Sequence, residues 1–475
     1  MIQRIIFTGL ILCTSVIAGQ PQSVKATRKW VKNNGHTIIK DFAHLLSMPN
    51  VASDKLNIRR NAKYISNLFK KRGFDMQLLE TEDANPIIYG EYKTPGAKRT
   101  LCFYVHYDGQ PVDSNQWTHG PFEPVLYDAA MDGGGNPIPL PGKRTKIDPE
   151  WRLYSRSAGD DKAPIITILN AVDGLQSSKI GFTSNIKLFF EGEEEAGSTN
   201  LQAHITKHKA LLDDIDIWLF CDGPMHQSRQ PQLVFGVRGV TGMEITVYGA
   251  TRSLHSGHYG NWAPVPGQSL AHLIATMKDD NGKVLIDGFY DTVVPLSEFE
   301  RFELSKIPDV DRQLKKELGL AYTEGNGRSI NERMLLPSLT IKGLSSGNVG
   351  KKARNVIPNT ATAAIGVRLV KGNEPNDMLD KVEAHIRKQG FHIVYENPDM
   401  ATRRKYPKIA KVDRRGSGYI ASRTSMEEPN AKAIINAVRE FVGDKLILMP
   451  ALGGSLPLYL FTDLLKKPAI IVPIA

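Results

Sequence analysis

The chain has 475 residues, more than one ordinary hydrophobic core organises, so a single small domain is excluded and we expect two compact units. Hydrophobic residues at 41% and charged residues at 23% exclude an intrinsically disordered chain. The net charge of +10 comes from Lys and Arg residues that are scattered along the sequence without a nucleic-acid-binding motif, so we expect no nucleic-acid partner.

The N-terminus reads as a signal peptide over residues 1–19. Arg4 precedes an apolar run, and Val16–Ala18 offers small residues for cleavage. The run is too short and too interrupted for a stable membrane span, which leaves an uncleaved anchor as the alternative. We therefore expect a secreted or periplasmic protein. Cys102 and Cys221 each lie in an apolar run, which indicates buried small side chains and no disulfide framework.

Apolar runs alternate with amphipathic stretches in the first half of the chain. Strands are predicted at 100–107, 185–191 and 216–222, and a helix over 162–172. This alternation indicates an α/β fold, with helices packed on the faces of a sheet. Segment 113–155 is rich in Pro, Gly and Asp, and we expect a long surface excursion without strands or helices there.

The pattern changes near residue 238. An alternating strand begins there and helix-like segments follow, with further alternating strands predicted at 338–344, 360–370 and 391–396. These elements predict an inserted α+β domain. A helix over 425–443 and buried strands over 445–452 and 468–475 return to the style of the first half. We therefore assign residues 30–236 and 421–475 to one domain and residues 237–420 to the insertion.

Residues of types that bind metals lie at the ends of three of the predicted strands and just before the predicted helix. They are His106 with Asp108, Asp160 with Asp161, the acidic run Glu191–Glu195, and Asp222. Each group alone is more often structural or solvated than functional. In open α/β sheets, however, ligands bind beyond the carboxyl ends of the strands, where these groups would meet. Four glutamates in five residues repel one another unless a cation lies among them. The donors fit zinc, and manganese or cobalt could be accommodated.

Five motifs, in order, carry a family resemblance: HYDGQPVD, RSAGDDKAP, EGEEEAGS, CDG and LHSGHYG. Together they resemble the M20 metallopeptidases, and specifically the carnosinase-like dipeptidase branch. The resemblance covers nearly the whole chain from about residue 35. It implies a zinc-peptidase α/β catalytic domain, with an inserted α+β lid domain through which the protein forms a homodimer.

The resemblance also implies a two-zinc site in each subunit. His106 and Asp222 would bind one zinc, Asp160 would bridge, and Glu195 would bind the other. Asp108 would hold the imidazole of His106 in its ligand tautomer. The residues themselves leave the choice of general base open between Glu193 and Glu194, and the family pattern favours Glu194.

Five further residues would act on the substrate. His255 resembles the lid histidine that reaches across such dimers to stabilise the oxyanion in the partner's site. Asn355 lies where the branch keeps a polar side chain, and Arg368 where it keeps an arginine that holds the substrate carboxylate. Gly454 and Ser455 resemble a loop whose backbone amides and hydroxyl also receive the substrate.

The expected function is hydrolysis of the peptide bond of a dipeptide or short peptide, by a zinc-activated water with Glu194 as general base. The family places a final zinc-binding histidine after the last strand, whereas this sequence stops at Ala475 and its last histidine is His392. We expect either a fragment or a chain without its second metal, with weak or no activity in these residues alone. The alternatives are an N-acyl amino acid deacylase and an inactive peptide-binding relative.

Overall fold

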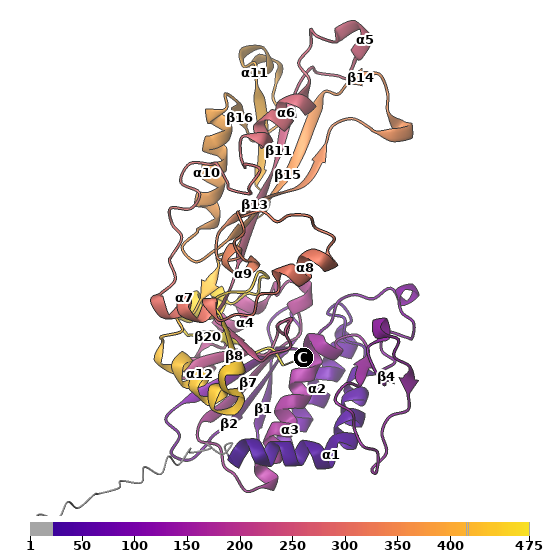
Figure 1. Ribbon diagram of the computed structural model, residues 1–475, viewed down its shortest axis with the longest axis vertical. Helices are drawn as coiled ribbons and strands as arrows, with labels where there is room; N and C mark the ends of the chain where they lie inside the picture. Colours follow the sequence, from indigo (N-terminus) through magenta and orange to yellow (C-terminus); the bar gives the residue numbers. More distant parts are fainter. Residues whose placement is uncertain (1–21, 415, 417, 475) are drawn as a thin grey trace, which may run out of the picture.

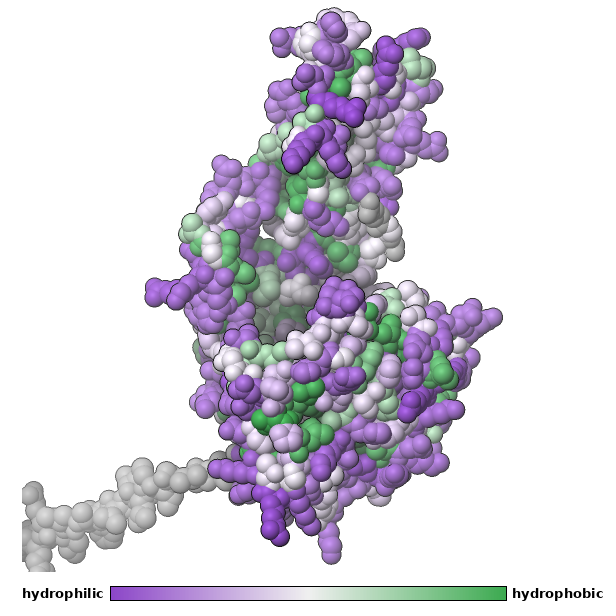
Figure 2. Space-filling model, turned by 90° about the vertical axis from the view of Figure 1, so that its right-hand side faces the viewer, coloured by the Kyte–Doolittle hydropathy of each residue, from purple (hydrophilic) through white to green (hydrophobic). Residues whose placement is uncertain are grey.

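The computed structural model describes residues 22–414, 416 and 418–474, and the predicted signal peptide lies outside these residues. Figure 1 shows an elongated molecule with two parts, a broad α/β domain below and a narrower domain above. We call them the catalytic domain and the lid. Figure 2 shows that the surface is hollowed between the two. The α/β fold with an inserted α+β lid is therefore confirmed.

The catalytic domain is built on an eight-stranded sheet in the order β1-β2-β7-β3-β8-β20-β9-β19. Its strands are β1 (Asp75–Leu79), β2 (Ile87–Tyr92), β3 (Thr100–His106), β7 (Asn185–Glu191), β8 (Ile217–Phe220), β9 (Gln232–Val234), β19 (Ile447–Met449) and β20 (Ala469–Ile471). Strands β7, β3, β8 and β20 run parallel to one another. Their carboxyl ends therefore meet at one edge of the sheet.

Helices cover both faces of this sheet. One face packs against α1 (Gln22–Leu46), α2 (Lys55–Lys70), α3 (Ala163–Ser177) and α12 (Pro429–Val442). The other packs against α4 (Leu201–Lys207) and residues 456–465, around the rings of Trp218, Phe220 and Phe461. Because both faces are covered, β7 and β8 are almost entirely buried, which explains their mostly apolar sequences.

The lid holds a five-stranded sheet in the order β13-β15-β11-β17-β16. Its strands are β11 (Gly239–Tyr248), β13 (Ser338–Ser345), β15 (Thr360–Leu369), β16 (His392–Val394) and β17 (Ile409–Arg414). Helices α6 (Pro266–Ala275) and α10 (Pro375–Lys388) pack on one face through a continuous apolar core. Residues of β15 alternate between buried and less buried positions because helices cover only that face.

The tip of the lid and the junction between the domains carry short elements. At the tip, β12 (Leu254–His255) pairs with β14 (Val356–Ile357), and α5 (Ser256–Tyr259) and α11 (Met400–Lys405) lie nearby (Figure 1). At the junction lie β10 (Gly236–Val237), which pairs with β18 (Ser422–Arg423), and α7 (Glu298–Ser305), α8 (Asp311–Glu317) and α9 (Ile330–Arg333).

Segment 113–155 differs from the sequence expectation. It forms a small antiparallel sheet of β5 (Pro137–Ile138), β4 (Val125–Tyr127) and β6 (Arg152–Tyr154). The prediction of no strands was wrong because strands of two or three residues are too short to show an alternating pattern. Cys102 and Cys221 are buried and unpaired. Among the described residues, none of the helices is long and apolar enough to cross a membrane.

Candidate metal centre and active site

His106 is the last residue of β3 and its side chain is fully buried. Its Nε2 lies 2.7 Å from Oδ1 of Asp160, and its Nδ1 faces Asp108, 3.2 Å from the carbonyl oxygen and 3.5 Å from Oδ1. The imidazole is therefore held on one side by Asp108, and its other nitrogen points into a group of acids.

Three of the predicted ligands converge at the carboxyl edge of the sheet. Ligand atoms of His106, Asp160 and Asp222 all lie within 4.8 Å of one another, and Oδ2 of Asp222 is 4.0 Å from Nε2 of His106. Asp222 follows β8, the parallel neighbour of β3. Asp160 precedes α3, in a turn where the Asp160–Asp161 peptide is cis. A hollow lined by Asp160, Asp222 and Gly223 opens beside them.

Asp108 holds the next acidic turn in place. Its two carboxylate oxygens accept hydrogen bonds from the backbone N–H groups of Glu194 and Glu195, each at 3.1 Å. Oε2 of Glu194 then lies 4.0 Å from Nε2 of His106, and Oε2 of Glu195 accepts a bond of 2.5 Å from the side chain of Gln110. Asp108 therefore fixes both glutamates relative to the histidine.

Glu193 points away from this cluster. One carboxylate oxygen accepts a bond of 2.7 Å from the backbone N–H of Asn85, and the other accepts 2.8 Å from the amide of Asn200. Nζ of Lys55 lies 3.4 Å from the first oxygen. Glu193 is thus an anchor of the turn, whereas Glu194 faces the histidine.

The crowded carboxylates perturb one another. Burial, followed by the neighbouring Asp160 and Glu195, raises the pKa of Asp222 to about 6. Burial raises the pKa of Glu194 to about 8, and burial also raises the pKa of Glu195. The pKa of Asp160 is lowered by its hydrogen bond to His106. One imidazole among four acids leaves an excess of negative charge, which a divalent cation would neutralise.

The predicted carboxylate-binding residues also meet. Nη1 of Arg368 donates a hydrogen bond of 2.8 Å to Oγ of Ser455, which in turn donates 2.9 Å to the carbonyl oxygen of Arg238. The carbonyl oxygen of Gly454 accepts 3.2 Å from the backbone N–H of Arg238. Arg368 reaches this loop from the end of β15 in the lid, so the group joins the two domains.

His255 and Asn355 do not reach the acidic cluster within one chain. The backbone N–H of Ser256 donates 3.0 Å to the carbonyl oxygen of Asn355, and His255 pairs with Val356 in the β12–β14 ribbon. Figure 1 shows this ribbon at the far end of the lid from the main sheet. The His255 ring is exposed and packs 4.7 Å from the ring of His258.

Comparisons with known proteins agree with this arrangement. Residues 235–393 match the peptidase dimerisation domain of the M20 family. The Cys-Gly metallodipeptidase dug1 of Schizosaccharomyces pombe is 26% identical over 460 residues, which cover 91% of this chain and 87% of that protein. The human Beta-Ala-His dipeptidase is 25% identical, covering 96% of this chain and 84% of that protein.

A solved structure extends the match to the fold. The M20 family metallo-carboxypeptidase Sso-CP2 from Sulfolobus solfataricus is 27% identical with a TM-score of 0.68, covering 92% of this chain and 90% of that one. The chain belongs to the M20 metallopeptidases. An M20 metallopeptidase uses a divalent metal, and the His106, Asp160 and Asp222 donors fit one.

Two residues of this M20 metallopeptidase site were given no role of their own by the sequence. Asp161 is buried, and its Oδ2 accepts a bond of 3.2 Å from the backbone N–H of His106. Gln110 binds Glu195 and follows Asp108 by two positions. Both contacts join residues more than 50 positions apart, so no local pattern in the sequence shows them. The signal that the sequence does hold is the closeness of both residues to predicted ligands.

Proposed function

We propose that this M20 metallopeptidase hydrolyses the peptide bond of dipeptides or short peptides, next to a free C-terminal carboxylate. The observation that carries the proposal is the position of Glu194, whose carboxylate lies 4.0 Å from His106 beside the Asp160 and Asp222 donors. The Arg368–Ser455 pair adds a receiver for a carboxylate. The names of the dipeptidase relatives also support a dipeptide substrate.

The donor set supports zinc as the metal, with manganese or cobalt as substitutes. We propose that His106, Asp160 and Asp222 would hold one ion, and that Asp160 and Glu195 would contribute to a second. Asp160 lies close enough to Glu195 for its charge to add to the burial that raises the pKa of Glu195. A divalent metal held here supplies the Lewis acidity that polarises a carbonyl and acidifies water.

Glu194 is the proposed general base. Its side chain is mostly buried and its backbone N–H is held by Asp108, so the carboxylate keeps one position beside the cluster. It would take the proton of the attacking water and return that proton to the leaving amine. Asp108 acts on the reaction by holding His106 and this turn.

Substrate binding would involve both subunits of a homodimer. In one chain, Arg368, Gly454 and Ser455 receive the substrate carboxylate at the domain junction. His255 and Asn355 lie together on the exposed tip of the lid, and we propose that they complete the site of the partner. The match to a peptidase dimerisation domain supports this arrangement.

The test is hydrolysis by the intact protein, with any C-terminal extension that carries the expected further histidine, during a zinc titration followed by mass spectrometry. Dipeptides and N-acyl amino acids with the same C-terminal residue are compared, and the Glu194→Ala variant is the control. The proposal expects zinc-dependent release of amino acids from dipeptides, abolished in the variant. Faster cleavage of the acyl amino acids would instead make the protein a deacylase. Zinc-loaded protein that binds dipeptides without cleaving them would refute an enzymatic role.

We also propose that the protein is secreted or periplasmic, because residues 1–19 have the pattern of a signal peptide. Expression in a secretion-competent bacterium tests this. N-terminal sequencing of the exported protein should begin near residue 20, whereas an uncleaved cytosolic product would contradict the proposal.

A further inference from the structure

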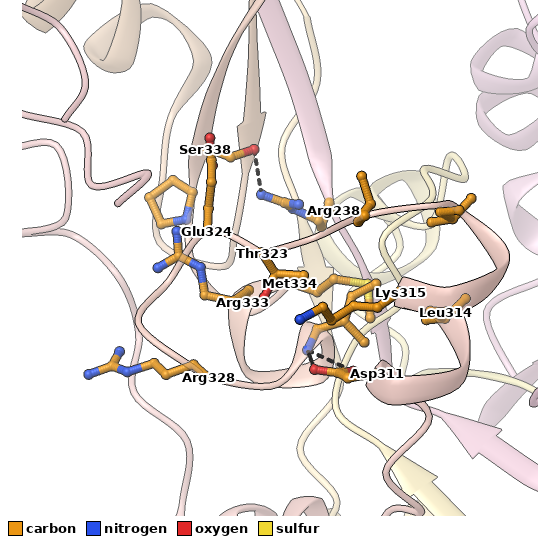
Figure 3. Close-up of a pocket in the computed structure, with 14 residues that line it drawn as sticks. Arg238, Asp311, Leu314, Lys315, Thr323, Glu324, Arg328, Arg333, Met334 and Ser338 are labelled. Atoms are coloured by element: carbon orange, nitrogen blue, oxygen red, sulfur yellow. Dashed lines mark hydrogen bonds between the residues drawn. The ribbon is translucent and has the colours of Figure 1, made fainter. Parts of the chain in front are cut away.

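A cavity of about 290 Å³ lies at the domain junction, and none of the proposed catalytic residues lines it. Its walls come from the segment that carries α8 and α9, from Arg238 before β11, and from Ser338 at the start of β13 (Figure 3). This volume is close to the lower end of the range for small-molecule sites. The cavity is therefore large enough for a compact organic ligand.

Most of the wall is apolar. Leu314, Leu318, Leu320, Ile330 and Met334 line it. Leu318 is 66% exposed and Leu320 is 48% exposed, so the cavity presents leucine side chains to solvent. Apolar surface of this kind is stabilised when a ligand covers it.

Arg238 supplies a buried cation at this cavity. Its side chain is only 8% exposed, and its Nη2 donates hydrogen bonds to the carbonyl oxygen of Leu336 at 2.8 Å and to Oγ of Ser338 at 3.0 Å. Its Nε is buried and has no hydrogen-bond partner among the described residues. Burial, followed by the nearby Arg368, lowers the pKa of Arg238 to about 10, so the guanidinium stays charged at neutral pH.

The other charged side chains that line the cavity leave it with an excess of positive charge. The Asp311 carboxylate is bound by the backbone N–H of Ile330, and Glu324 forms an ion pair with Lys278. Neither acid is paired with Arg238, and within the described ranges Lys315 has no ion pair. Figure 3 shows Arg238 and Lys315 facing the interior, whereas Arg328 extends away from the other labelled residues. An anion is therefore favoured over a cation or a zwitterion.

We propose that this cavity binds a small carboxylate with a branched apolar tail. The carboxylate bonds to the free Nε–H of Arg238 and approaches Lys315, and the tail packs against Leu314, Leu318 and Met334. A guanidinium suits this role because a carboxylate satisfies its planar donors. The site is distinct from the substrate loop, although the backbone of Arg238 contacts both Gly454 and Ser455.

The test uses 4-methylpentanoate, with 4-methylpentanamide as its uncharged isostere. Binding to the full zinc-loaded chain is measured by isothermal titration calorimetry. The carboxylate should bind roughly tenfold more tightly than the amide, because a charged hydrogen bond is lost in the amide. Equal affinity of the two compounds, or no binding of either, would overturn the proposal.

Three variants locate the site. Leu318→Glu places a negative charge on the exposed wall and should weaken carboxylate binding by roughly tenfold. Leu56→Glu, at a leucine of α2 that is 80% exposed, is the matched control and should leave binding unchanged. Arg368→Gln should also keep binding. If Arg368→Gln abolishes binding while Leu318→Glu does not, the carboxylate occupies the substrate loop and the proposal is wrong.

Discussion

Glu193 and Glu194 are adjacent and chemically identical, yet their side chains point to different surroundings, and we propose different roles for them. Replacing each by alanine separates these roles. Glu193 is 7% exposed and accepts hydrogen bonds from the buried backbone N–H of Asn85 and from the amide of Asn200. Loss of a charged hydrogen bond costs about 1.5–3 kcal/mol. The contact with Lys55 adds little because that lysine is 56% exposed.

Glu193→Ala should therefore lower the free energy of unfolding by roughly 3–6 kcal/mol, because both hydrogen bonds are lost. Glu194→Ala should leave the free energy of unfolding nearly unchanged, because it removes one of several buried carboxylates that repel one another. It should lower kcat by about 10²–10⁴-fold as the general base is lost.

The assay pairs urea unfolding, followed by tryptophan fluorescence, with dipeptide hydrolysis at saturating zinc. Saturating zinc keeps metal occupancy the same in both variants, so the contrast reports the glutamates themselves. If Glu193→Ala keeps the wild-type unfolding midpoint and loses activity, while Glu194→Ala stays active, the assignment of the two residues is reversed.

Three further predictions concern the metal, the dimer and the substrate. Asp222→Asn should bind at least one zinc fewer in native mass spectrometry with an unchanged circular dichroism spectrum; an unchanged zinc count would remove Asp222 from the ligands. A mixture of the Glu194→Ala and His255→Ala variants should regain about a quarter of wild-type activity after subunit exchange. Half of the randomly formed dimers then contain one subunit of each kind, and each such dimer holds one intact site out of two. A mixture that stays inactive after subunit exchange would argue against action in trans. Arg368→Gln should raise KM for dipeptides by roughly tenfold or more, with a smaller change in kcat, and an unchanged KM would exclude it as the carboxylate receiver.

The sequence predicted the central strands well because strands covered on both faces carry mostly apolar residues. It also placed His106, Asp160 and Asp222 together, since the ends of parallel strands share one edge. The roles of Glu193 and Glu194 could not be separated from composition alone. They differ only in the direction in which the turn after β7 points each side chain, and Asp108 and Asn85 set that direction.

Other features depend on contacts that no local pattern reports. Arg238 is an ordinary charged residue in the sequence, and its burial results from packing against Leu336 and Ser338, which lie about 100 residues away. The strands in segment 113–155 are too short to alternate visibly. The location of His255 at the lid tip follows from the length of β11 and β15, which carry the β12–β14 ribbon away from the catalytic domain.

The order of strands in the catalytic sheet has a consequence for biosynthesis. β20 lies between β8 and β9 in the sheet. Ala469 of β20 pairs with Trp218 of β8, although the whole lid lies between these two residues in the sequence. A nascent chain that has already emerged through β8 and β9 therefore lacks the strand that separates them. Asp222 follows β8 directly, so its position depends on that late insertion. The lid can fold on the ribosome before the catalytic sheet closes, and metal loading is expected to follow the emergence of β20.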